Sequence, residues 1–145
     1  MYQKIILAYN GSLESQQALF NCKDLSQWGH AEVHLLSVVP YETLSMSNET
    51  TYYSDHHNKN EEERSLKILN DGVAQLKIDG IEASGKLLNG DAVDHIVTYA
   101  KSFEADLIML GHKHGQYWME RWWSGTIPKA LIEQSPCSVL VVIIK

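Results

Sequence analysis

Four residues in the carboxyl-terminal third of the chain have the types and spacing that phosphate binding requires. Gly111 and Gly115 follow an apolar run, and Gly125-Thr126 comes after nine further residues, at the start of a short segment with helical periodicity. Phosphate oxygens need backbone N–H groups at close approach, which side chains obstruct. The amino end of a helix supplies such donors and a positive dipole end, and the Thr126 hydroxyl adds another donor. The pattern therefore predicts a nucleotide site where a strand opens into a turn.

A plainer interpretation of the same residues stays open. Gly111 and Gly115 could only shape a turn, and Thr126 could only cap a helix. The Gly-x4-Gly-Lys-(Ser/Thr) phosphate loop is absent, so the chain is not a Walker-type ATPase. Lys113 and the imidazole of His112 lie inside the glycine turn, and both could contact phosphate oxygens.

The histidines of this turn also allow a metal site. His112 and His114 could meet His56 and His57, which lie in a long segment without periodicity. No carboxylate or cysteine shares the spacing of a recognised zinc motif, so polar residues on a solvated turn are the simpler interpretation and we predict no metal site.

The segment between Gly115 and Gly125 contains three tryptophans, at positions 118, 122 and 123. They could stack on a base, but covering a sheet edge or a partner surface is the simpler interpretation. Arg121 could reach a phosphate or could be a surface cation. No catalytic constellation is visible, because there is no nucleophile elbow and no identifiable general base. Cys22 lies on an apolar helical stripe, where packing is the expected role.

Composition restricts the class of protein. The chain of 145 residues is predicted to form one domain, residues 1–145. A net charge of −6 argues against a general nucleic-acid binder. The longest apolar runs fall far short of the roughly 18–20 residues that a membrane span needs. No signal peptide is recognisable, and two lone cysteines fit a reducing compartment, so we expect a cytoplasmic protein.

Apolar runs alternate with segments of helical periodicity along the whole chain. Buried strands are expected at residues 4–9, 31–39, 81–88, 106–110 and 138–144. The third is the least apolar and is expected at a sheet edge. Residues 41–59 are expected to form a loop, with a helix starting at the acidic residues from Glu61. The order β-α-β-α-β-α-β-α-β predicts an α/β fold, a doubly wound five-stranded parallel sheet with helices on both faces, Rossmann-like.

Three stretches of the sequence resemble the universal stress protein family. Residues 4–12 (KIILAYNGS) resemble its first strand and Asp-Gly-Ser turn, with Asn10 where the family usually has aspartate. Asn89-Gly90-Asp91 is similar to its Gly-Asp. Gly125-Thr126, together with the apolar last strand after Pro136-Cys137, resembles the family's carboxyl-terminal part. The resemblance covers the whole chain.

The family's nucleotide motif, Gly-x2-Gly-x9-Gly-(Ser/Thr), is matched in its second half by Gly115, Gly125 and Thr126. The first half differs, because three residues separate Gly111 from Gly115. Either the turn carries one extra residue, or His112 stands in place of the first glycine. Asn10 can still donate and accept hydrogen bonds, but it brings no charge to a ribose or a metal ion.

The resemblance implies a small cytoplasmic stress-response protein that binds an adenine nucleotide, ATP foremost and in some cases with Mg2+, and acts as a regulator or sensor. The nucleotide contacts that it implies fall on Ala8, Tyr9, Asn10, Val38, Gly111, His112, Lys113, Gly115, Gly125, Thr126 and Ile127. It also implies a homodimer paired through the last strand, from Val139 to Ile144, and an apolar edge strand independently favours such pairing. Two alternatives stay open: a dimeric partner-binding protein without nucleotide, and a slow ATP hydrolase.

Overall fold

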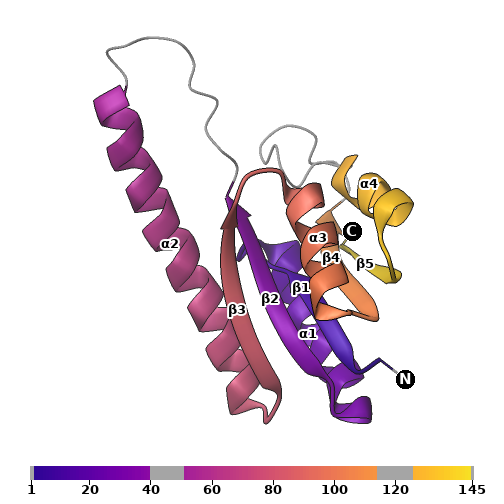
Figure 1. The fold of residues 1–145 in the computed structure, drawn as a ribbon. Helices are drawn as coiled ribbons and strands as arrows, with labels where there is room; N and C mark the ends of the chain where they lie inside the picture. The colour runs from indigo at the N-terminus through magenta and orange to yellow at the C-terminus, as the bar shows by residue number, and fades with distance from the viewer. Residues whose placement is uncertain (1, 40–50, 114–125, 145) are drawn as a thin grey trace.

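A computed structural model of the chain shows a five-stranded parallel sheet in the order β3-β2-β1-β4-β5, with helices on both faces (Figure 1). The elements are β1 (Lys4–Ala8), α1 (Leu13–Gly29), β2 (Glu32–Val39), α2 (Thr51–Ile78), β3 (Glu82–Asn89), α3 (Ala92–Phe103), β4 (Leu107–Lys113), α4 (Thr126–Gln134) and β5 (Ser138–Ile144). The structure describes residues 2–39, 51–113 and 126–144, and of residues 25–29, 51–59 and 126 it describes only the backbone. The predicted fold class is confirmed.

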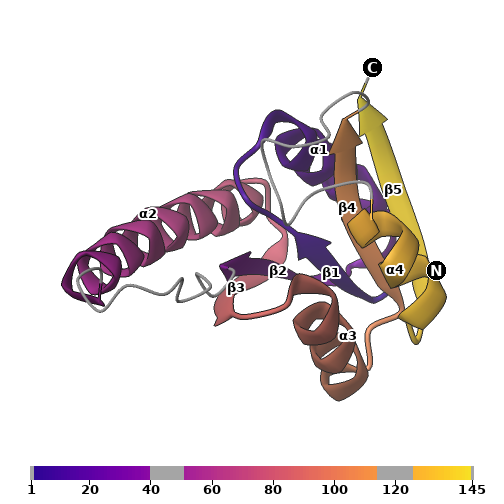
Figure 2. The same ribbon diagram turned by 90° about the horizontal axis from the view of Figure 1, so that it is seen from above.

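The two faces of the sheet carry separate apolar cores. Ile5 and Leu7 of β1 point into a cluster with residues of α1 and α2, whereas Ile6 and Ala8 point into a cluster with residues of α3 and α4. Figure 2 shows the two pairs of helices on opposite sides of the sheet. Strands covered on both faces must be apolar on both, which is why the run of β1 has no alternation.

The two edge strands differ in character. β3 is an edge strand, as its lower apolar content predicted, and it exposes Glu82 and Lys86. β5, at the other edge, is apolar and only partly covered, with Leu140 39% and Ile143 53% exposed. Charged side chains protect an edge from unwanted pairing, and β5 (SVLVVII) carries none.

Two elements differ from the expectation drawn from the sequence. Helix α2 begins at Thr51, so residues 51–59 are helical rather than part of a loop, while residues 40–50 lie outside the described residues. These first turns extend beyond the carboxyl ends of the strands (Figure 1), where no sheet imposes an apolar stripe on them. β4 continues to Lys113 instead of ending at Leu110, because β5 pairs with it along its whole length.

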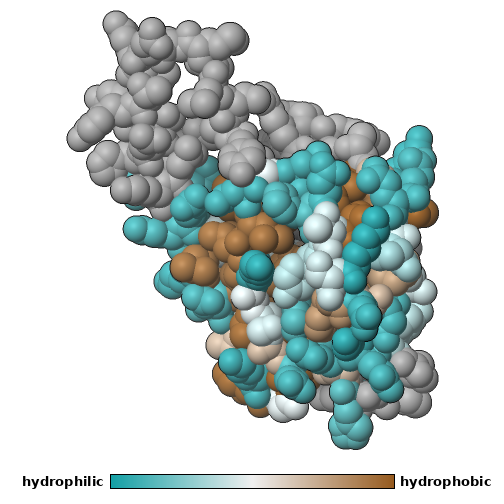
Figure 3. Space-filling model, viewed as in Figure 1, coloured by the Kyte–Doolittle hydropathy of each residue, from teal (hydrophilic) through white to brown (hydrophobic). Residues whose placement is uncertain are grey.

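Helix α2 approaches the sheet closely because two glycines leave room for it. A Cβ on Gly72 of α2 would lie 2.9 Å from Leu35 Cδ2 of β2, and one on Gly85 of β3 would lie 2.8 Å from Val73 Cγ2 of α2. Apolar surface on this side of the molecule gathers beside α2 and β3, whereas hydrophilic side chains cover most of the rest of the face seen in Figure 3. Because Gly72 and Gly85 have no side chains, the helix can lie close to the sheet edge.

Candidate functional site

The candidate site lies at the carboxyl ends of β1 and β4, where the strand order changes direction. From β1 the chain passes through α1 to β2 on one side, and β4 adds on the other side of β1. In doubly wound sheets ligands bind at this point, because the connections leave it in opposite directions and open a crevice. Among the residues predicted for the site, the structure describes the backbone of Ala8, Tyr9, Asn10, Val38, Gly111, His112, Lys113, Thr126 and Ile127. Gly115 and Gly125 lie outside the described residues.

The turn after β1 is held by its own side chains. The Ser12 backbone N–H donates to Asn10 Oδ1 at 2.9 Å, and the Ser15 N–H donates to Ser12 Oγ at 3.2 Å, so that Ser12 caps α1. Gly11 has a φ of +80°, which favours glycine. The Asn10 amide nitrogen can donate two hydrogen bonds and makes none within the described part of the chain. The turn therefore presents an amide donor and not a charge.

Ala8 and Val38 lie on the α3/α4 face of the sheet, but the Tyr9 side chain lies on the other face. Ala8 and Val38 belong to the buried cluster of α3 and α4, and Tyr9 belongs to that of α1 and α2. The Tyr9 N–H donates to the Leu36 carbonyl at 2.9 Å. Burial, and secondarily the charge of Asp71, raises the pKa of the Tyr9 hydroxyl. A ligand on the α3/α4 face could therefore meet Tyr9 only through its backbone.

Gly111 lies inside β4 rather than in a turn, which corrects the expectation drawn from the sequence. It is buried and paired with Val142 of β5. A Cβ on Gly111 would lie 2.0 Å from the backbone oxygen of Glu14, so its lack of a side chain lets the first turn of α1 approach the strand. His112 and Lys113 continue the strand and are half-buried. β4 therefore includes three residues that the sequence placed in a turn, Gly111 to Lys113.

Helix α4 begins at Thr126, as predicted, and its first turn belongs to the candidate site. Ile127 is buried in the same cluster as Ala8, Val38 and Leu110. The free N–H groups and dipole of this helix end suit an anionic group. The sequence interpretations of His114, Arg121 and the three tryptophans lie outside the described residues, as do those of the His56 and His57 side chains. Within the described ranges no three histidine, cysteine, aspartate or glutamate side chains group as a metal would need.

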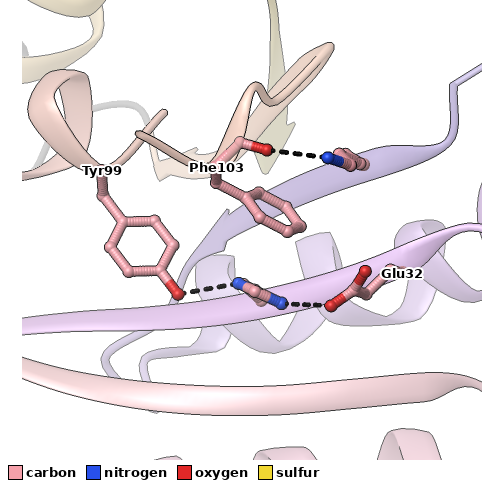
Figure 4. A network of polar contacts seen from close by, with 5 residues as sticks. Glu32, Tyr99 and Phe103 are labelled. Carbon is pink, nitrogen blue, oxygen red and sulfur yellow. Dashed lines mark hydrogen bonds and ion pairs between the residues drawn. The ribbon is translucent and has the colours of Figure 1, made fainter. Parts of the chain in front are cut away.

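A second polar cluster, which the sequence did not single out, ties α3 to β2 away from the carboxyl edge (Figure 4). His34 Nδ1 lies 2.7 Å from the Tyr99 hydroxyl, and His34 Nε2 lies 2.7 Å from a Glu32 carboxylate oxygen. The imidazole stacks on Phe103 at 3.8 Å between ring centroids. Because an ionised carboxylate only accepts, neutral His34 carries its hydrogen on Nε2 and accepts from Tyr99. Burial, followed by the Glu32 charge, raises the pKa of Tyr99.

The other end of α3 is fixed at the carboxyl edge of the sheet. Asp91 caps the helix by accepting from the Val93 N–H at 2.9 Å and the Asp94 N–H at 3.3 Å. The Gly90 N–H donates to the Val39 carbonyl at 2.9 Å. Asn89-Gly90-Asp91 thus joins the end of β3 to the end of β2, beside Val38. No helix in the described part of the chain is long and apolar enough to cross a membrane.

Proteins of known sequence or structure resemble this chain over nearly its whole length. Universal stress protein YxiE of Bacillus subtilis is 27% identical, covering 98% of this chain and 99% of its own. Universal stress protein MJ0531 of Methanocaldococcus jannaschii is 28% identical, covering 98% of this chain and 82% of its own. The solved structure of MJ0577 shares the fold with a TM-score of 0.84 at 22% identity, covering 100% of this chain and 98% of that one.

Solved structures with this fold include nucleotide complexes. One is a universal stress protein in complex with cAMP, with a TM-score of 0.69 at 18% identity, covering 97% of each chain. Another is a family protein from Arabidopsis thaliana with AMP bound, with a TM-score of 0.67 at 17% identity, covering 99% of this chain and 92% of that one. The profile of the Universal stress protein family matches residues 1–142. This chain therefore belongs to the universal stress protein family.

Proposed function

We propose that this protein binds an adenine nucleotide, ATP foremost, at the carboxyl ends of β1 and β4 and acts as a cytoplasmic regulator or sensor in a stress response. The observation that carries the proposal is the strand order, which brings the Tyr9–Ser12 turn and the first turn of α4 to one switch point. The cAMP and AMP complexes of proteins with the same fold support adenine as the base.

The described residues suggest how the nucleotide would be held. The ends of β1 and β2 offer backbone groups near Ala8 and Val38 for the adenosine part, and Asn10 offers an amide donor. The N–H groups at the start of α4 would receive phosphate oxygens. Gly115 and Gly125 remain the predicted close contacts of the phosphates. Asn10 gives Mg2+ no carboxylate at this position, so the turn after β1 brings no negative charge to a metal ion.

Calorimetric titration with ATP, ADP and AMP tests the proposal. We expect saturable binding with heat, and at about 100 times the dissociation constant the ligand should stabilise the fold by about 2.7 kcal/mol. No heat and no thermal shift at millimolar nucleotide would refute nucleotide binding. Gly125→Trp, which places a large side chain in the predicted phosphate contact, should abolish the heat of the wild type.

We also propose that the protein forms a homodimer by pairing β5 with the β5 of a second copy. The motivating observation is the partly exposed apolar edge formed by Leu140, Ile143 and their neighbours in β5. Pairing would satisfy the outward N–H and C=O groups of this edge strand and cover its apolar side chains.

A further inference from the structure

Helix α2 lies directly against the turn that follows β1. A Cβ on Gly11 would lie 2.6 Å from Ile68 Cγ2, so the Gly11 backbone and the Ile68 side chain are in van der Waals contact. Ile68 is half-buried and packs against the core of α1 and α2. Gly11 has a φ of +80°, and no substituted residue would adopt this backbone without strain. The turn conformation and the position of Ile68 are therefore linked.

A second contact joins α2 to the same stretch one helical turn further on. A Cβ on Gly72 would lie 2.8 Å from Tyr9 Cε1, which places the Tyr9 ring against the helix backbone. Tyr9 is 6% exposed, so its ring has no other position open to it without moving α2. Both residues that flank Asn10 in the chain thus rest on α2, while the Asn10 amide nitrogen makes no hydrogen bond with the residues that the structure describes.

The rest of α2 divides into two parts. Its last turns are anchored to the sheet by Leu69, Val73 and Leu76, which are buried. Its first turns, from Thr51, extend beyond the carboxyl ends of the strands (Figure 1). The contact with Gly11 is made by Ile68, where the extended part meets the anchored part, and the contact with Tyr9 is made at Gly72, within the anchored part. A change in the turn therefore acts where α2 leaves the sheet.

We propose that α2 reports the occupancy of the nucleotide site through the Ile68–Gly11 and Gly72–Tyr9 contacts. The inference rests on the proposed nucleotide binding and adds its readout. A nucleotide that fixes the Tyr9–Ser12 turn also fixes the side of the turn on which Ile68 packs, so α2 becomes better ordered. This coupling is reciprocal. If nucleotide binding favours the packing of α2 on the turn by some factor, loss of that packing weakens nucleotide binding by the same factor.

A matched pair of substitutions in α2 separates this coupling from a general loss of stability. Ile68→Ala removes the side chain that contacts Gly11, whereas Leu66→Ala shortens a side chain that is 45% exposed, two residues away. We expect the ATP dissociation constant, measured by calorimetry, to rise at least about fivefold for Ile68→Ala, the lower end of typical couplings. Leu66→Ala should stay within about twofold of the wild type.

Hydrogen exchange of the wild-type protein supplies the second readout. ATP should slow amide exchange in α2 near Ile68 and Gly72 as well as in the Tyr9–Ser12 turn, and Ile68→Ala should remove the α2 part of this protection. Gly72→Ala adds a methyl group against the Tyr9 ring, at the other contact, and a folded Gly72→Ala protein should also bind ATP more weakly than the wild type.

The outcomes distinguish the two proposals. If the wild type binds no nucleotide, both the proposed function and the readout fail. If the wild type binds ATP but Ile68→Ala and Leu66→Ala have equal affinities, the readout alone is overturned. Slower exchange confined to the turn, with α2 unchanged, would also overturn it while leaving nucleotide binding intact.

Discussion

Asn10 stands where β1 ends, and its side-chain oxygen already accepts a hydrogen bond from Ser12 within the turn. The amide keeps this turn without adding a charge, and an aspartate at the same place would keep it too, because both side chains can accept from the residue two positions on. Asparagine and aspartate at this position would therefore differ in how they contact a ligand and not in how they support the fold. Recognition at this position would rest on a donated hydrogen bond.

The position of Asn10 was predictable, but the orientation of its neighbour was not. An apolar run followed by Asn-Gly-Ser indicates a strand, a turn and a helix cap. The run is apolar at every position, so no polar residue marks which face Tyr9 occupies, and the structure alone places its ring against α2. The roles of Gly115 and Gly125 remain predictions from sequence.

Cys22 has the packing role predicted for it, and its burial predicts that the fold loses stability in alkali. It is fully buried, and burial raises the pKa of its thiol to about 12. A thiol whose pKa is raised by folding contributes stability that is fully present below its unfolded pKa and is lost as pH rises toward the folded one. From about pH 9 to about pH 12 the free energy of unfolding should fall by up to about 1.4 kcal/mol per pH unit from this group.

Chemical denaturation of Cys22→Ala between pH 8 and pH 10.5 checks this expectation. The variant should lose less stability with pH than the wild type, whatever its stability at pH 8. Cys137→Ala is the matched control, because it removes the other cysteine from a partly exposed position. Equal slopes in all three proteins would contradict a role for the Cys22 thiol.

At the scale of elements, the sequence predicts the order and type of the nine elements that the structure describes, and two of their ends differ from the prediction by more than one residue. The first turns of helix α2 have no apolar stripe in their sequence, and periodicity is the main signal for a helix, so the sequence pattern starts this helix too late. The pattern also ends β4 too early, because glycine is a common strand breaker. Gly111 lies within β4 because the backbone of α1 packs against it at Glu14. This contact is not visible in the sequence around Gly111.

Gly111→Ala should therefore weaken the packing of α1 on β4. The added Cβ would meet the Glu14 backbone, which cannot move aside as a side chain can, and we expect a loss of about 1–3 kcal/mol in the free energy of unfolding. Gly85→Ala in β3 is the control, since its Cβ would meet side-chain atoms of Val73 and Leu69 rather than backbone and should cost less. If Gly111→Ala proved the more stable of the two in urea, this explanation of Gly111 would be wrong.

At the scale of the whole molecule, the proposed dimer depends on the unequal edges of the sheet. Val141 packs against the core of α3 and α4, so charging it would disturb the fold as well as the edge. Ile143 is 53% exposed and is the better probe of pairing.

Ile143→Lys should shift the protein from dimer to monomer in sedimentation velocity, because a buried lysine opposite its own mate is costly. Ile78→Lys is the control, since Ile78 is 78% exposed at the end of α2, far from β5 in the fold, and it should leave the dimer intact. A dimer that persists with Ile143→Lys would refute pairing through β5.

The glycines at the helix–sheet contacts also limit how this protein could be engineered. Replacing glycine by alanine is a usual way to raise stability, because it restricts the unfolded chain. At Gly72, Gly85 and Gly111 the added methyl group would fall within 3 Å of a neighbouring atom. A thermostabilised variant would have to gain its stability elsewhere, on the exposed faces of the helices, and leave these three positions as they are.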